Sequence, residues 1–290
     1  MTEALEHCTA TINGVELHYV TAGSGPLVVL LHGFPEFWYS WRHQIAPLAE
    51  SHTVVAVDQR GYNTSSKPTG VGAYALWHLV EDVRALVVHL GYDRATIVGH
   101  DWGGVVAWSF AMRHPGMVER LAILNLPHPQ LFRKALKTNP RQMLRSWYAG
   151  AFQVPRLPEW LMQQNEYAAL VGALTNTVKR PNTFSAADLA EYRRAWAQPG
   201  ALTAMVNWYR AAARYGGTFY KNLISQCVHM PTLLIWGTND LALGQELTYG
   251  TERYATDLRV RYLNGISHWV QQEAPDEVNA VLVLFVRGAW

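Results

Sequence analysis

The sequence has few cysteines and no long apolar run, and both absences exclude classes of protein. Its 290 residues contain two cysteines, Cys8 and Cys227, so we expect free thiols, no disulfide framework and a cytoplasmic location. No segment approaches the roughly 20 apolar residues that a membrane-spanning helix needs. The first 19 residues include Glu3 and Glu6 and lack a continuous apolar core, so we expect no signal peptide.

An excess of charge of one sign is also lacking. Lysine and arginine number 24 against 22 aspartates and glutamates, which gives a formal net charge of +2. This balance offers no electrostatic reason to bind nucleic acid or an anionic membrane. Hydrophobic residues make up 49% and charged residues 16%, as in a well-packed globule. We therefore expect neither nucleic acid nor a membrane as a partner.

Apolar runs of strand length alternate with longer segments of helical periodicity. Across residues 76–90, apolar side chains recur at the three- and four-residue spacing of one helix face. Because apolar strands separated by helices are typical of a sheet covered on both faces, we expect an α/β fold with a doubly wound, mostly parallel sheet. The expected strands are Val15–Val20, Leu27–Leu31, Val54–Val57, Thr96–Gly99, Leu121–Asn125, Leu233–Trp236 and Leu258–Leu263, and the expected helices are Leu76–Leu90, Val105–Met112 and Glu246–Tyr254.

The alternation stops after Pro127-His128-Pro129. From about residue 136 to residue 215 the sequence has helical stretches, several prolines and no convincing strand, and strand-like sequence resumes at Leu233. We therefore expect a helical cap domain, residues 136–215, inserted between two strands of a core made of residues 1–135 and 216–290. Such a cap lies over the strand ends and excludes water from a site beneath it.

The segment Gly99-His100-Asp101-Trp102-Gly103-Gly104 has the spacing of a nucleophile elbow, with aspartate at its centre. It follows an expected strand and precedes an expected helix, and its glycines leave room for a sharp turn. Asp101 is thereby expected near a helix N-terminus, which favours its negative charge. A plain helix cap is the alternative interpretation of Asp101, and the partner residues described next weigh against it.

An aspartate at this position favours a particular chemistry. A carboxylate is ionised at neutral pH without help from a base. It is therefore suited to displacement at a saturated carbon, which forms an alkyl ester on Asp101. Water must then attack the carbonyl carbon of that ester, and this second step needs a general base.

We expect His268 to be this base and Asp240 to orient it, because each follows an expected strand. The chain order of nucleophile, acid and histidine matches this arrangement of strands. Asn239 is the alternative to Asp240, but an amide cannot stabilise an imidazolium by charge.

The second step also needs donors for the oxyanion that forms on Asp101. We expect these to be the backbone N–H groups of Trp102 and of Phe34, which lies in the loop His32-Gly33-Phe34-Pro35. The loss of one such donor typically raises the barrier by about 3 kcal/mol.

Together these motifs resemble those of the α/β-hydrolase-fold epoxide hydrolases, and of bacterial members in particular, over almost the whole chain. The segments that carry the resemblance are His32–Arg42 (HGFPEFWYSWR), Asp58–Tyr62 (DQRGY), Gly99–Gly104 (GHDWGG), Ser146–Tyr148, Phe152-Gln153 and Asn207–Arg210. The resemblance implies the α/β-hydrolase fold and the hydrolysis of an epoxide to a vicinal diol, with no cofactor and no metal. It leaves the oligomeric state open between a monomer and a homodimer.

In that family two cap tyrosines bind the epoxide oxygen, and the matching motif positions are Tyr148 and Tyr209. The chemistry agrees, because tyrosine keeps its proton at neutral pH and can donate it to the alkoxide that forms when the ring opens. The two tyrosines, with Phe34 and Trp102, are expected to line the substrate site.

Two other functions stay open at this point. A dehalogenase on the same fold also forms an ester on aspartate. The haloalkane type commonly has asparagine after His-Gly, where this chain has Phe34, or a second tryptophan in the cap to complement the one after the nucleophile. This chain has Trp102 after the nucleophile, and its expected cap contains Trp147, Trp160, Trp196 and Trp208. A non-catalytic small-molecule receptor could keep the fold, although it would not need a nucleophile, a base and both tyrosines.

Overall fold

One eight-stranded sheet forms the centre of the structure, and the computed structural model describes residues 5–220 and 226–289. Glu3 of the N-terminal stretch lies outside the described residues. The strand order is β1-β2-β4-β3-β5-β6-β7-β8. The strands are β1 (Glu6–Ile12), β2 (Val15–Ala22), β3 (Leu27–Leu31), β4 (Thr53–Val57), β5 (Ala95–His100), β6 (Val118–Leu124), β7 (Thr232–Gly237) and β8 (Leu258–Leu263).

The sheet is parallel from β4 to β8 and antiparallel at the edge formed by β1 and β2. Every residue of β3, β5 and β7 is buried, which agrees with their mostly apolar sequences. The expectation of a doubly wound, mostly parallel sheet is confirmed.

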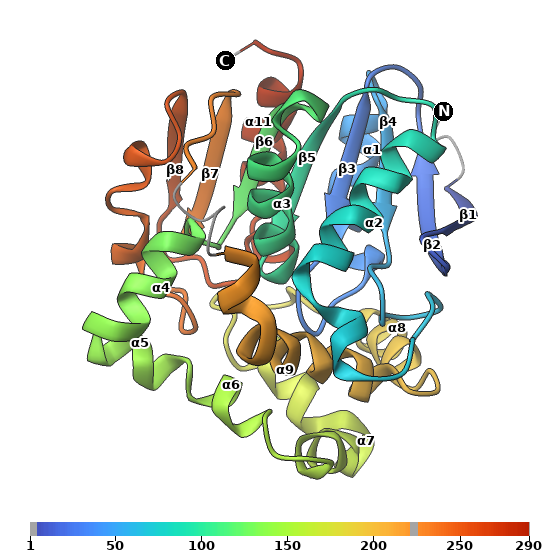
Figure 1. The fold of residues 1–290 in the computed structure, drawn as a ribbon, viewed down its shortest axis with the longest axis vertical. Coiled ribbons are helices and arrows are strands. Elements are labelled where there is room, and N and C mark those ends of the chain that lie inside the picture. Colours follow the sequence, from blue (N-terminus) through green and yellow to red (C-terminus); the bar gives the residue numbers. More distant parts are fainter. Residues whose placement is uncertain (1–4, 221–225, 290) are drawn as a thin grey trace.

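Helices cover both faces of this sheet. Figure 1 shows α2 and α3 in front of the strands and α1 and α11 behind them. The expected helices at 76–90 and 105–112 are confirmed as α2 and α3. The bounds of the core helices are α1 (Arg42–Ala49), α2 (Leu76–His89), α3 (Trp102–Arg113), α10 (Val270–Glu273) and α11 (Pro275–Val286).

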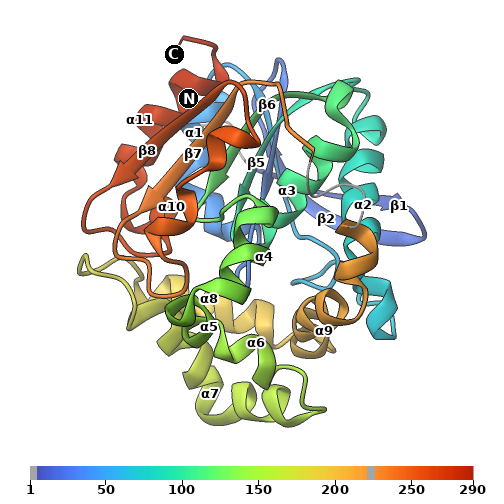
Figure 2. The same cartoon turned by 60° about the vertical axis from the view of Figure 1, so that its left-hand side comes forward.

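All the described elements between β6 and β7 are helices. They gather beyond one end of the sheet, as Figures 1 and 2 show. Residues 136 and 215 lie inside α4 and α9, and the division of the chain into a core and a cap domain stays a prediction. The helices are α4 (Pro129–Thr138), α5 (Pro140–Arg145), α6 (Trp147–Ala151), α7 (Leu157–Thr175), α8 (Ala186–Trp196) and α9 (Ala201–Tyr220).

Two local expectations need correction. Strand β1 was not expected, although Asn13 and Gly14 between β1 and β2 both have positive φ and form the tight hairpin turn that an Asn-Gly pair favours. The helix expected over Glu246–Tyr254 is wrong. Two short 3₁₀ turns, Gln245–Thr248 and Thr251–Arg253, replace it, because Gly250 between them has a left-handed conformation with φ +93°.

The two cysteines, Cys8 and Cys227, are free thiols. Among the described residues, no helix has both the length and the apolar character needed to cross a bilayer.

Candidate active site

Asp101 lies in a strained turn between β5 and α3. Its φ and ψ are +50° and −121°, a conformation that a non-glycine residue adopts at a cost of roughly 1–3 kcal/mol. The neighbouring glycines permit the turn: a Cβ on Gly99 would lie 2.4 Å from the Gly103 carbonyl oxygen, and one on Gly103 would lie 2.0 Å from the Leu31 carbonyl oxygen. Glycine thus occupies the two positions at which a side chain would collide with neighbouring backbone, and Asp101 lies at the tip of the turn between them.

The loop that follows β3 packs directly against Asp101. A Cβ on Gly33 would lie 2.4 Å from the Cβ of Asp101, so glycine is required at this contact. The next residue, Phe34, donates its backbone N–H to Asp101 Oδ1 at 2.9 Å. Trp102 is the first residue of α3, and its N–H as a second donor stays a prediction.

His268 and Asp240 approach Asp101 from the ends of β8 and β7. His268 Nε2 lies 3.5 Å from Asp101 Oδ2, and His268 Nδ1 donates to Asp240 Oδ2 at 2.7 Å. Asp240 is buried, whereas Asn239 is exposed, so it is the carboxylate that faces the imidazole. The structure therefore brings together the three side chains that the sequence grouped.

Asp240 has four hydrogen-bond donors. Its Oδ1 accepts the backbone N–H groups of Ala242 and Leu243, at 2.7 and 2.9 Å. Its Oδ2 accepts from the side chain of Asn125 at 2.7 Å, in addition to His268. Such a carboxylate is fixed in orientation and well solvated by the protein.

Asn125 was not singled out from the sequence. It follows β6, has φ +43°, and its Oδ1 accepts the Gly237 N–H at 2.9 Å. It therefore ties the end of β6 to the end of β7 and to Asp240. Its position directly after a strand next to β7 is the signal that could have found it.

The charges of these groups depend on one another. Burial alone would raise the pKa of Asp101, but the hydrogen bond and the charge of His268 outweigh it and hold that pKa below its ordinary value. For His268, burial lowers the pKa, whereas the carboxylates of Asp240 and Asp101 raise it, to about 10. The resting site therefore pairs an imidazolium with two carboxylates at neutral pH.

Two tyrosines from the cap helices meet the core beside Asp101. Tyr148 on α6 and Tyr209 on α9 have ring centroids 5.9 Å apart. The Tyr209 ring lies 5.0 Å from Trp102 and 5.3 Å from Phe34, in edge-to-face contacts. Phe152 completes the cluster, 4.9 Å from Tyr209. The four aromatic residues predicted to line the site thus lie together.

Both tyrosines keep their protons at neutral pH. Burial is the main cause that raises the pKa of each hydroxyl well above its ordinary value. The negative charge of Asp101 raises the pKa of both hydroxyls further.

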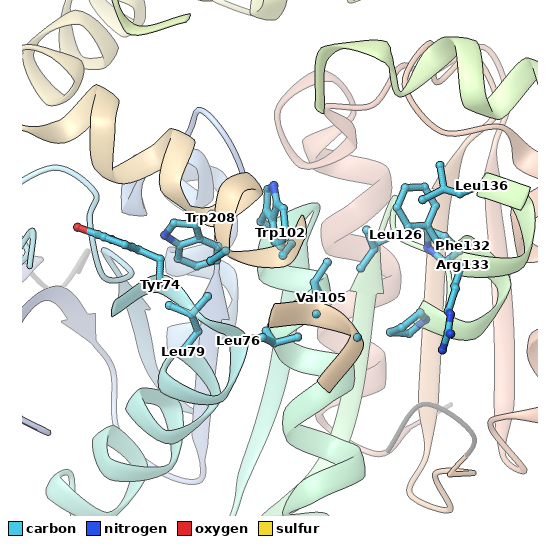
Figure 3. Close-up of a pocket in the computed structure, with 16 residues that line it drawn as sticks. Tyr74, Leu76, Leu79, Trp102, Val105, Leu126, Phe132, Arg133, Leu136 and Trp208 are labelled. Carbon is cyan, nitrogen blue, oxygen red and sulfur yellow. The ribbon is translucent and has the colours of Figure 1, made fainter. Parts of the chain in front are cut away.

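A cavity of about 320 Å³ adjoins this cluster, and Trp102 belongs to both. Figure 3 shows Trp102 and Trp208 on one side of it, Phe132 and Leu136 on the other, and Leu126 between. Its walls are mostly apolar. The sequence did not reveal this cavity, because most of its lining comes from α2, α3, α4 and α9, which are distant in the chain.

Behind the site lies a buried pair, His100 and Glu36. His100 Nε2 donates to the carbonyl oxygen of His268 at 2.9 Å, and His100 Nδ1 lies 2.8 Å from Glu36 Oε2. The side chain of Gln271 also donates to Glu36. This network holds the backbone of the loop that carries His268. Both residues lie in the quoted motifs, but their roles were not predicted.

Known proteins with similar sequences point the same way. The α/β hydrolase fold family matches residues 26–275. The AB hydrolase superfamily protein YfhM of Bacillus subtilis is 40% identical over 95% of this chain and 96% of its own length. Epoxide hydrolase 4 of Mus musculus is 37% identical over 97% of this chain and 79% of its own length.

Solved structures agree with these relatives. An epoxide hydrolase from Bacillus megaterium, determined in complex with an inhibitor, superposes with a TM-score of 0.89 at 34% identity, over 97% of this chain and 100% of that one. Epoxide hydrolase VrEH1 of Vigna radiata has a TM-score of 0.87 at 27% identity, over 99% of each chain. The expected fold is confirmed, and the chain belongs to the family of α/β-hydrolase-fold epoxide hydrolases.

Proposed function

We propose that this protein hydrolyses an epoxide to a vicinal diol through a covalent ester on Asp101. The observation that carries the proposal is the pairing of a carboxylate at the elbow with two protonated tyrosines. The carboxylate supplies a nucleophile for saturated carbon, and the tyrosines supply protons for a poor leaving group. The relatives named epoxide hydrolase support the same substrate class.

In the first step, Asp101 Oδ2 attacks one ring carbon of the epoxide. Oδ1 is already engaged by the Phe34 N–H, which leaves Oδ2 for the attack. As the new carbon–oxygen bond forms, the ring bond breaks and its electron pair passes to the epoxide oxygen. That oxygen takes a proton from Tyr148 or Tyr209. The products are an alkyl ester on Asp101 and a tyrosinate.

In the second step, His268 removes a proton from water, and the hydroxide attacks Cγ of Asp101. Negative charge develops on Oδ1, where the Phe34 N–H already lies at 2.9 Å. The intermediate collapses, the ester bond to the substrate breaks, and the alkoxide takes the proton from His268. Asp101 returns its proton to the tyrosinate, so one epoxide and one water have become one diol.

The charge of Asp101 controls when His268 can act as a base. In the resting site the carboxylates of Asp240 and Asp101 outweigh burial and raise the pKa of His268 to about 10, so the imidazole is protonated. Esterification removes the charge of Asp101. The pKa of His268 must then fall, so the imidazolium releases its proton to solvent and is neutral in the step that needs a base. It takes a proton back from solvent once Asp101 is a carboxylate again.

The cavity next to Trp102 suggests the kind of epoxide that fits. Its volume of about 320 Å³ and its mostly apolar walls suit an aromatic ring or a branched alkyl group. We propose that this cavity holds the apolar substituent while the epoxide ring lies between Asp101 and the tyrosines.

A product assay tests the proposed function. The protein is incubated with an aryl glycidyl ether and, separately, with a haloalkane, while diol and halide are measured. We expect diol and no halide. Halide without diol would indicate a dehalogenase, and neither product across a panel of both substrate classes would favour a receptor.

A further inference from the structure

The outer side of the cap carries an unusual concentration of exposed apolar side chains. Among the large apolar residues exposed in the described part of the chain, Leu144 and Trp147 are the most accessible, at 74% and 70%. Other exposed apolar side chains lie close to them in the sequence. The exposed apolar residues of α4 to α7 are Leu136, Met143, Leu144, Trp147, Val154, Leu157, Trp160 and Leu161.

These residues lie on helices that follow one another in space. In both Figures 1 and 2, α4, α5, α6 and α7 run in succession from beside the sheet to the far end of the cap. Trp147 is exposed and directly precedes Tyr148, which contacts Tyr209 on the inner side. We call the exposed surface of residues 133–161 the outer cap face.

The outer cap face is also cationic. The sequence has no aspartate or glutamate between Glu119 and Glu159. Six cations belong to residues 133–161, five of them exposed and Arg145 half-buried. In the described residues none of the six forms an ion pair with a carboxylate. They are Arg133, Lys134, Lys137, Arg141, Arg145 and Arg156.

The net charge of +2 conceals this segregation. Without these six cations the remaining residues have more acids than bases, since the totals are 24 bases and 22 acids. Two carboxylates touch the face. Glu159 is paired with Arg210 at 2.6 Å, and Glu246 accepts a hydrogen bond from Asn139, where α4 meets α5. Neither pairs with a cation of the outer cap face.

We propose that the outer cap face docks the protein on a lipid bilayer that contains anionic phospholipids. Exposed tryptophan and leucine side chains among unpaired lysines and arginines fit the boundary between headgroups and acyl chains. The cations then lie at the level of the phosphates, where each strengthens the attraction to an anionic surface. This is a peripheral contact, and it requires no helix that spans the bilayer.

Charge argues against a second copy of the chain as the occupant. A two-fold interface through this face would place its six unpaired cations against the same six of the partner. Like charges brought together without carboxylates oppose association. An anionic surface is instead complementary to them.

The docking goes beyond the proposed reaction and does not depend on it. If both hold, they are linked in space, because α4 supplies Phe132, Arg133 and Leu136 to the lining of the apolar cavity. A bilayer on the outer cap face would then lie beside the cavity that receives an apolar substituent. Apolar epoxides concentrate in lipid, so the surface would hold the substrate near its site.

Co-sedimentation with vesicles tests the docking directly. The full chain is mixed with vesicles of phosphatidylcholine alone or of phosphatidylcholine with phosphatidylglycerol. We expect about tenfold or greater partitioning onto the phosphatidylglycerol vesicles, and loss of this preference at high salt. Equal partitioning onto both vesicles, or none onto either, would overturn the proposal.

Matched variants locate the contact. Leu144→Glu with Trp147→Glu, and separately Lys134→Glu with Lys137→Glu, should each reduce binding about tenfold. Val88→Glu and Leu284→Glu change exposed apolar residues on α2 and α11, at 55% and 48% exposure, and should bind as the parent does. Circular dichroism checks that each variant is folded. Equal losses in the controls would contradict the assignment.

Sedimentation velocity without vesicles distinguishes the competing occupant. We expect the same oligomeric state for the parent and for Leu144→Glu with Trp147→Glu. A dimer that this double variant converts to a monomer would make the face a contact between copies, and the lipid proposal would be wrong.

Discussion

His268 Nε2 lies within ion-pair distance of Asp101 Oδ2, at 3.5 Å, while the other ring nitrogen is bound by Asp240. The pKa of the His268 imidazole thus depends on the charge of Asp101, the proposed nucleophile. The imidazole carries a proton while Asp101 is a carboxylate and is expected to lose it once Asp101 is esterified. This coupling separates the two chemical steps, because only the second needs a neutral imidazole.

Replacing Asp101 with asparagine should lower the pKa of His268. The carboxylates of Asp240 and Asp101 together outweigh burial and raise that pKa to about 10, and asparagine keeps the size of the side chain but not its charge. We expect the pKa to fall by about one unit or more, as measured from imidazole chemical shifts during a pH titration. Asp240→Asn should lower it further, because Asp240 is the largest of the causes that raise it. An unchanged pKa in both variants would contradict the charge coupling.

Asn125 should act through Asp240 as a positioning residue. Asn125→Ala removes one donor to Asp240 Oδ2 and the acceptor of the Gly237 N–H, both buried, at a cost of about 1–3 kcal/mol. We expect ester hydrolysis to slow about tenfold while ester formation changes little, as measured in single turnovers. Asn239→Ala, at the exposed neighbour of Asp240, is the control. If Asn125→Ala slowed ester formation and ester hydrolysis equally, or if Asn239→Ala had the same effect, Asn125 would have only a structural role.

The two cap tyrosines should share the role of proton donor. Tyr148→Phe and Tyr209→Phe each leave one hydroxyl at the epoxide oxygen, so each should slow ester formation moderately. The double variant leaves none, and we expect a loss of about 10²–10⁴-fold in kcat/KM. Tyr167→Phe changes a cap tyrosine that packs on Trp196 and should leave the rate intact. If the double variant retained most of its activity, the tyrosines would have another role.

Filling the cavity beside Trp102 should discriminate between large and small substrates. Ala212 and Ala213 are both exposed on α9, but only Ala212 lines the cavity. Ala212→Trp should reduce kcat/KM for an aryl glycidyl ether about tenfold or more and should spare a small alkyl epoxide. Ala213→Trp should spare both. If Ala212→Trp lowered kcat/KM equally for both substrates, the apolar substituent would not bind in this cavity.

The sequence was informative where function depends on short local patterns. The glycines around Asp101 predict a sharp turn. The positions of Asp240 and His268 after strands predict that His268 reaches Asp101 and that Asp240 reaches His268, as the structure places them. The choice of Asp240 over Asn239 followed from charge. The resemblance to a family supplied Tyr148 and Tyr209, which composition alone could not distinguish from packing residues.

The features that the sequence did not reveal depend on contacts between distant segments. Asn125 meets Asp240 across 115 residues, and His100 meets Glu36 across 64. Neither contact leaves a periodic pattern in the chain. The expected helix near Gly250 failed because one left-handed glycine divides a segment whose apolar spacing is otherwise helical. The cationic outer cap face was concealed because the net charge averages over the whole chain.

The covalent ester on Asp101 can be detected by the mass of the intact His268→Gln variant after incubation with an epoxide. Without the base, the first step should proceed and the second should not, so we predict an increase equal to the mass of the epoxide, located on Asp101 by peptide mapping. The variant Asp101→Asn with His268→Gln should show no increase. Diol formation by His268→Gln with no trapped adduct would contradict a covalent ester on Asp101.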